Sequence, residues 1–170
     1  MKIEKKKISE NESLFYFSTP LPITGTFCAK KNIPAPNTLL NNIYQTNLAE
    51  IILLTTDFIY IKAINTHALA DLELLTLAEV DDYCSVPLSP QIADNEHTED
   101  KIEIILKTVI APFLQADGGD IEFISYQNNI LSVHFLGKCQ GCPYAQRTLQ
   151  NHVTKNLIHY LPQIKEVKLL

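Results

Sequence analysis

A polar, acidic stretch interrupts the chain near its middle and limits how the chain can fold. It contains Pro87 and Pro90, and its second half, Asp94–Asp100, has too little apolar content to pack into a core. With 46% hydrophobic residues in a total of 170, the chain has enough apolar material for more than one small core. We therefore predict two domains, 1–86 and 99–170, joined by a linker over residues 87–98.

Residues 1–86 have the pattern of a small α+β domain. Short apolar and β-branched runs bounded by turn residues indicate strands, and longer runs with apolar residues at helical spacing indicate helices. Asn37 is placed to cap the first helix, and Thr56-Asp57 to turn a hairpin. The predicted strands are 14–17, 25–29, 50–55 and 58–64, and the predicted helices are 38–47 and 67–83.

The second domain has a clearer pattern, in the order helix, strand, strand, helix, strand. Apolar residues from Ile102 to Phe113 recur at helical spacing, and Pro112 should kink or loosen the last turn of that helix. Asn128-Asn129 is a plausible two-residue hairpin turn. The remaining elements are strands at 121–127, 130–136 and 164–169 and a helix at 143–161. The fold class is therefore α+β, with two small domains and a small three-stranded sheet in the second.

Two cysteines lie three positions apart where the second of these strands gives way to the following helix. The segment runs Gly137-Lys138-Cys139-Gln140-Gly141-Cys142-Pro143. Such a pair can hold one metal ion or cluster between its thiols, but a structural zinc or an iron–sulfur cluster takes about four ligands. Either a second copy of the chain supplies the missing ligands, or the pair performs dithiol redox chemistry.

Other candidate sites are weaker. His152 and His159 follow the cysteine pair at spacings that do not suit a zinc finger. Cys28 and Cys84 are isolated, so we expect them to pack rather than to bind a metal. The carboxylates of Asp117-Gly118-Gly119-Asp120 supply few of the six or more oxygens that calcium prefers, which favours a turn. The sequence contains no signature of a hydrolase, a phosphate-binding loop or a zinc protease, and we expect no enzymatic turnover.

Charge restricts the classes of partner. The net charge of −5 argues against a nucleic-acid-binding surface that covers the whole protein. The charge is uneven, because residues 137–170 carry five basic side chains and only one acidic one, Glu166. We interpret this basic tail as a solvated face, and proximity to an anionic ligand is the alternative.

The first ten residues bear on the cellular compartment. Met1–Glu10 carries four lysines and two glutamates, without arginine and without an apolar core region. Signal peptides need such an apolar region, and organelle transit peptides favour arginine and avoid acidic residues. No apolar run in the chain approaches the ~20 residues of a membrane-spanning helix. We therefore expect a cytoplasmic protein that makes no membrane contact.

The two motifs of the second domain together resemble a known family. Leu114–Asp120, a strand pair and then Gly137–Pro143 look like the C-terminal domain of the NifU-like (Nfu) iron–sulfur cluster scaffold and carrier proteins. The N-terminal part is similar to the additional domain of the longer Nfu proteins, a similarity that depends on Leu53–Lys62 and its flanking helices.

This resemblance implies a function. Cys139 and Cys142 would bind an iron–sulfur cluster, [4Fe-4S], shared between two subunits of a homodimer. An upstream assembly scaffold would donate the cluster, and apo iron–sulfur proteins would receive it. Two alternatives remain: an oxidoreductase with a reversible disulfide between the two cysteines, and a zinc-binding module between subunits.

Overall fold

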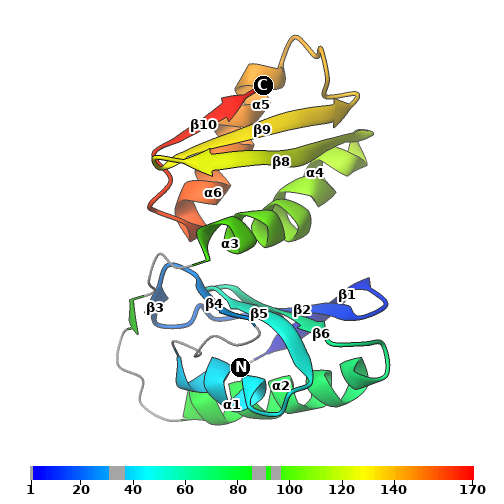
Figure 1. The fold of residues 1–170 in the computed structure, drawn as a ribbon, viewed down its shortest axis with the longest axis vertical. Coiled ribbons are helices and arrows are strands. Elements are labelled where there is room, and N and C mark those ends of the chain that lie inside the picture. The colour runs from blue at the N-terminus through cyan, green and yellow to red at the C-terminus, as the bar shows by residue number, and fades with distance from the viewer. Residues whose placement is uncertain (1, 31–36, 86–90, 93–96) are drawn as a thin grey trace. The chain divides into compact units, whose positions relative to one another are not determined.

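The computed structural model describes residues 2–30, 37–85, 91–92 and 97–170. The chain divides into two compact units, Met1–Glu96 and His97–Leu170 (Figure 1). Each unit combines helices with a β-sheet, which confirms the predicted α+β class. Within the described ranges, no helix is long and apolar enough to cross a membrane.

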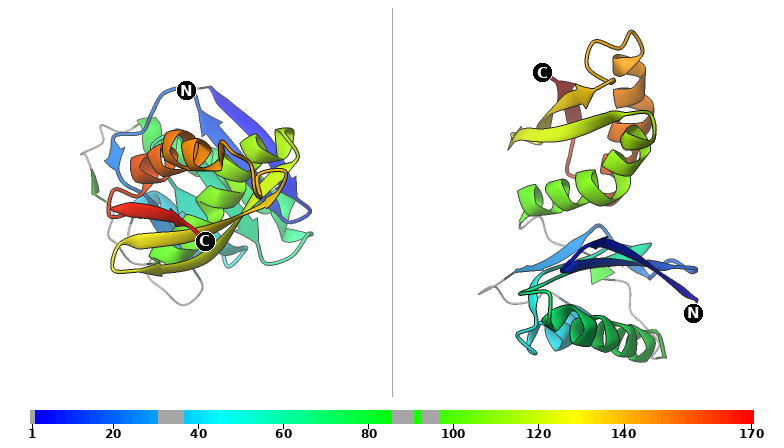
Figure 2. Two further views of the ribbon diagram at one scale, coloured as in Figure 1. Left: turned by 90° about the horizontal axis from the view of Figure 1, so that it is seen from above. Right: turned by 90° about the vertical axis from the view of Figure 1, so that its right-hand side faces the viewer.

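The first unit is built around a five-stranded sheet with the strand order β1-β2-β6-β5-β4. Its neighbouring strands are all antiparallel. Two helices lie against one face of this sheet (Figure 2), and their apolar side chains, including Leu40 and Leu72, form the core with residues such as Phe15 and Ile59. The elements are β1 (Ile3–Ser9), β2 (Glu12–Phe17), β4 (Phe27–Lys30), α1 (Thr38–Tyr44), β5 (Ala49–Leu54), β6 (Phe58–Ala63) and α2 (Ala68–Ser85).

Most of the predicted elements of this unit are confirmed. The Asn37 side chain accepts a hydrogen bond from the Leu40 amide and so caps α1, as its position in the sequence suggests. Strand β1 was not predicted, because its run of lysines hides the period-2 pattern. As an edge strand it can keep those charges in solvent.

Part of the predicted linker, 87–98, is structured. Residues Gln91–Ile92 form β7, which pairs in parallel with β3 (Ile23–Thr24), and the first helix of the second unit already begins at Thr98. Residues 86–90 and 93–96 lie outside the described residues. The exact domain boundaries stay a prediction.

The second unit has a three-stranded sheet in the order β10-β9-β8. Strands β8 and β9 are antiparallel, and β10 is parallel to β9. Two helical segments contribute to a core that includes Ile105, Leu114, Val133 and Leu157. The elements are α3 (Thr98–Ile105), the π-helical turn η1 (Leu106–Ile110), α4 (Ala111–Ala116), β8 (Gly119–Gln127), β9 (Ile130–Gly137), α5 (Ala145–Thr148), the π-helical turn η2 (Leu149–Thr154), α6 (Lys155–Tyr160) and β10 (Glu166–Leu169).

Pro112 acts one turn earlier than expected. The helix does not end there but continues to Ala116, and the loosened turn is η1, which ends two residues before the proline. In this turn the Ala111 amide bonds to the carbonyl of Leu106, five residues back. Because proline has no amide hydrogen and crowds the preceding turn, a widened turn at this point accommodates it without breaking the helix.

The hairpin turn is confirmed, and the start of the following helix is displaced. Asn128 and Asn129 have φ angles of 52° and 64°, the left-handed conformation that a type I′ turn requires. The predicted helix start at Pro143 is wrong by two residues, because Pro143 and Tyr144 form a turn and α5 begins at Ala145.

Candidate metal centre

The loop that carries Cys139 and Cys142 connects β9 to α5 through a series of tight turns. The amide of Cys139 donates to the carbonyl of Leu136 at 3.3 Å, and the amide of Cys142 donates to the carbonyl of Cys139 at 3.4 Å. The carbonyl of Cys142 accepts from Ala145, the first residue of α5, at 3.0 Å. Backbone hydrogen bonds therefore hold both cysteines between a strand end and a helix start.

A second segment, Gly118-Gly119, packs against this loop. In the β8–β9 register Gly119 lies opposite Gly137, and the Lys138 amide donates to the Gly118 carbonyl at 3.1 Å. The approach is close: a Cβ added at Gly137 would lie 2.6 Å from the Gly118 oxygen. Gly137 also has a φ of +60°, which favours glycine for a second reason.

The thiol of Cys139 lies directly on Gly119. A Cβ added at Gly119 would collide with the Cys139 sulfur, and would also lie 3.0 Å from the Cys139 Cβ. The position of this thiol thus depends on a residue twenty positions earlier that has no side chain. We expected Asp117–Asp120 to form a turn but did not foresee that it would contact the cysteine loop.

The four cysteines occupy different environments. Cys139 and Cys142 are both partly exposed, and Cys139 also packs against the core of the second unit. Cys28 is buried in β4, and Cys84 lies near the end of α2 against the core of the first unit. All four are free thiols. The structure therefore brings Cys139 and Cys142 together in one loop, and places the other two as packing residues.

Partial burial and nearby acidic groups raise the pKa of the Cys139 thiol. Desolvation by partial burial raises the pKa of the Cys139 thiol, and the nearby Cys142, Asp117 and Asp120 raise this pKa further. A raised pKa is the opposite of what a nucleophilic redox cysteine needs. Because the thiolate is the form that binds iron or zinc, metal uptake at Cys139 must release a proton.

A single chain does not complete a metal site within the described residues. No group of three or more His, Cys, Asp or Glu side chains is arranged there to hold a metal ion. His152 stacks on Phe113 instead, with ring centroids 4.5 Å apart, and His159 contacts Tyr160 edge-on. Each described chain therefore offers two sulfur ligands, which fits a site shared by two copies.

Two exposed apolar side chains border the cysteine loop. Tyr144, two residues after Cys142, is 66% exposed, and Leu136, three residues before Cys139, is 38% exposed. Large exposed apolar groups beside a binding site favour contact with another protein surface. The sequence did not identify either residue, because a single apolar residue gives no signal that distinguishes an exposed position from a buried one.

Comparison with known proteins finds a family match in the part of the chain that contains this site. Residues 102–168 match the NifU-like domain, which confirms the resemblance for the part of the chain that contains both motifs. The chain is 40% identical over 75 residues to the "NFU1 iron-sulfur cluster scaffold homolog, mitochondrial" of Drosophila persimilis, a match that covers 44% of the chain and 27% of the relative. It is 38% identical over 77 residues to the protein of the same name from Drosophila willistoni, covering 45% of the chain and 27% of the relative.

These matches also set limits. The matched part spans only about a quarter of the length of these relatives. The NifU-like match does not extend into the first unit, so the similarity of that unit to the additional Nfu domain stays a prediction.

The expected cytoplasmic location is contradicted. The matched relatives are named as mitochondrial, which points to mitochondria rather than to the cytoplasm. The expectation depended on the composition of Met1–Glu10 and on the lack of a long apolar run. Most of those residues belong to strand β1. Their charged composition is explained by an exposed edge strand and therefore does not indicate the cellular compartment.

Proposed function

We propose that this protein is an iron–sulfur cluster carrier, in which Cys139 and Cys142 bind a [4Fe-4S] cluster between two copies of the chain and release it to apo-proteins. One observation supports this most strongly. The two thiols are fixed in a loop that rests on Gly118-Gly119, inside a domain that matches the NifU-like family.

The number of ligands supports a shared site. An iron–sulfur cluster takes about four protein ligands, and one described chain offers two thiols and no further group of suitable side chains. A twofold axis through the loop would bring the same two cysteines from each copy to one cluster. The choice of [4Fe-4S] over [2Fe-2S] comes from the resemblance to the family, since either cluster can be held by two pairs of thiolates.

The environment of Cys139 suits release as well as binding. When a thiolate of the receiving protein replaces Cys139 on an iron atom, the departing Cys139 thiolate takes up a proton. The raised pKa of Cys139 favours this protonated state and so favours departure. Lys138, which directly precedes Cys139, and Arg147 on α5 are both exposed, and their positive charges would offset part of the negative charge of the cluster.

The same environment disfavours one of the two alternatives and leaves the other open. A dithiol oxidoreductase needs a cysteine with a lowered pKa, whereas the pKa of Cys139 is raised. A zinc module between subunits uses the same four thiolates, so the ligand set does not separate it from a carrier. Colourless protein with about one zinc per two chains and no cluster uptake would favour the zinc module.

A transfer experiment tests the proposal. The full chain is loaded with iron and sulfide under anaerobic conditions, separated from free iron, and mixed with an apo-enzyme whose activity requires a [4Fe-4S] cluster. We expect that enzyme to become active at the same rate with and without an iron chelator, because the cluster passes directly between proteins. Mössbauer spectra of the loaded chain report the cluster type.

The control in this experiment is free iron and sulfide at the same concentration, which the chelator should block. If the chelator also blocks activation by the loaded chain, the iron travels through solution and the carrier function is refuted. The donor is not needed for this test, because iron and sulfide load the chain directly. We propose that the first unit selects partners and that an upstream scaffold supplies the cluster.

A further inference from the structure

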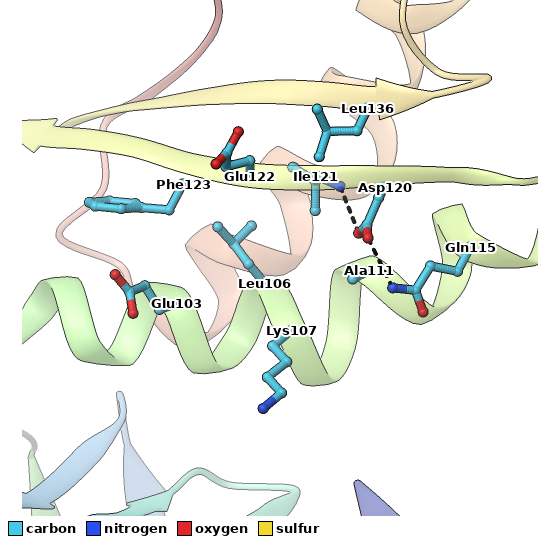
Figure 3. A pocket seen from close by; sticks show the side chains of 10 residues that line it. All are labelled: Glu103, Leu106, Lys107, Ala111, Gln115, Asp120, Ile121, Glu122, Phe123 and Leu136. Atoms are coloured by element: carbon cyan, nitrogen blue, oxygen red, sulfur yellow. Dashed lines mark hydrogen bonds between the residues drawn. The ribbon is translucent and has the colours of Figure 1, made fainter. Parts of the chain in front are cut away.

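A groove runs between the first helical segment and β8 of the second unit (Figure 3). Its volume is about 440 Å³, and all of the residues that line it belong to this unit. Leu106, Ile121 and Phe123 extend into the space between the helix and the strand and make its floor apolar. A groove of this size accepts a few side chains of an extended peptide rather than a globular surface.

The strand beside the groove is an edge strand without lysine or proline, although a register irregularity between Phe123 and Ser125 interrupts its pairing with β9. In the order β10-β9-β8, only one side of β8 is paired within the described residues. Natural edge strands commonly carry lysine or proline, which discourage a further strand from pairing. Strand β1 of the first unit carries three lysines in a row, whereas β8 has neither lysine nor proline and exposes Ile124 at 44%. The outer edge of β8 from Gly119 to Phe123, before this irregularity, is therefore suited to accept a strand.

The rim of the groove is acidic. Glu103 on α3 and Glu122 on β8 are both exposed and stand on either side of the opening (Figure 3). Asp120 closes one end, where it accepts a hydrogen bond from Gln115 at 3.2 Å. Lys107 also lines the groove, so the lining carries the three carboxylates of Glu103, Asp120 and Glu122 against one ammonium group. A segment with lysine or arginine side chains would complement this rim.

One end of the groove meets the cysteine loop. Leu136 lines the groove, and its carbonyl oxygen accepts the hydrogen bond from the Cys139 amide. Asp120 also lines the groove, and its neighbour Gly119 contacts the Cys139 sulfur. A peptide that lies along β8 would therefore extend to the edge of the site that holds Cys139 and Cys142.

We propose that this groove and the outer edge of β8 dock an extended segment of a cluster-receiving protein. The segment pairs with β8 as an added strand, places apolar side chains on the floor and directs lysine or arginine toward Glu103 and Glu122. The identity of the partner depends on the proposed carrier function, whereas the binding itself does not require a cluster.

A peptide titration of the cluster-free full chain tests this inference. The probe is a synthetic peptide of alternating lysine and valine, and a peptide of alternating glutamate and valine is its matched control. NMR shifts of the backbone amides report where each peptide binds. We expect shifts along β8 and near Glu103 with the basic peptide, and about tenfold weaker binding in the double variant Glu103→Lys with Glu122→Lys.

Glu166→Lys is the control for each of the two substitutions made singly, because it makes the same change from glutamate to lysine on β10, the opposite edge of the sheet. It should bind the basic peptide as the unaltered chain does. Equal binding of the acidic peptide, shifts confined to other surfaces, or unchanged affinity in the double variant would overturn the inference. Cluster loading of the double variant, measured in parallel, stays normal if the groove only docks partners, so a failure of the carrier function remains distinguishable.

Discussion

Replacing either Cys139 or Cys142 by serine is expected to abolish cluster uptake. In a site shared by two copies, one substitution per chain removes two of about four sulfur ligands. A serine hydroxyl does not replace a thiolate here, because it stays protonated at neutral pH and binds iron weakly. After anaerobic reconstitution, the iron content and the visible absorption of either variant should fall to background.

Cys28→Ser and Cys84→Ser are the matched controls. Both residues are in the first unit, one buried in β4 and one near the end of α2, and neither lies in the cysteine loop. Each variant should load as much iron as the unaltered chain, although Cys28→Ser places a hydroxyl in the core and is expected to lower stability somewhat. Full loading of the Cys142→Ser variant would refute the assignment of the ligands.

The second large effect is expected from Gly119→Ala. The new methyl group would occupy the place of the Cys139 sulfur, so the thiol and its loop must move. Overpacking of this kind costs about 1–3 kcal/mol of folding stability. We expect little or no cluster uptake by this variant, even though both cysteines are present, because the displaced loop no longer presents its thiols in one arrangement.

A double-mutant cycle separates this contact from a general loss of stability. Cys139→Ala removes the sulfur, so adding Gly119→Ala to that variant should cost less free energy of unfolding than it does in the unaltered chain. Denaturant unfolding of the four proteins measures the difference. If Gly119→Ala costs the same in both backgrounds, the contact between Gly119 and the Cys139 sulfur does not explain its effect.

The sequence predicts the contact between the Gly118-Gly119 turn and the cysteine loop to within one residue of register. Counting outward from the turn at Asn128-Asn129 places Gly119 opposite Lys138, beside the cysteines. The structure has an irregularity between Phe123 and Ser125 that shifts the register by one residue, so that Gly119 pairs with Gly137. The sequence has no clear signal for such a bulge. The pairing of Gly119 with Gly137 explains why two glycine-rich segments far apart in the chain belong to one site.

Local sequence patterns predict some features of the structure and miss those that depend on tertiary contacts. The order of the second unit follows from its apolar periodicity, and the hairpin from its asparagine pair. Strand β1 depends on pairing with β2, a tertiary contact that stabilises a lysine-rich segment with little strand pattern of its own. The raised pKa of Cys139 likewise depends on a tertiary feature, the partial burial of the thiol, and to a smaller extent on Cys142, Asp117 and Asp120.

Native mass spectrometry of the anaerobically loaded full chain tests the central claim most directly. If two copies share one cluster through Cys139 and Cys142, the cluster should be found only on paired chains, and dilution should release cluster and partner together. Single chains should carry no cluster at any concentration. A single chain that keeps a complete cluster after dilution would contradict the account.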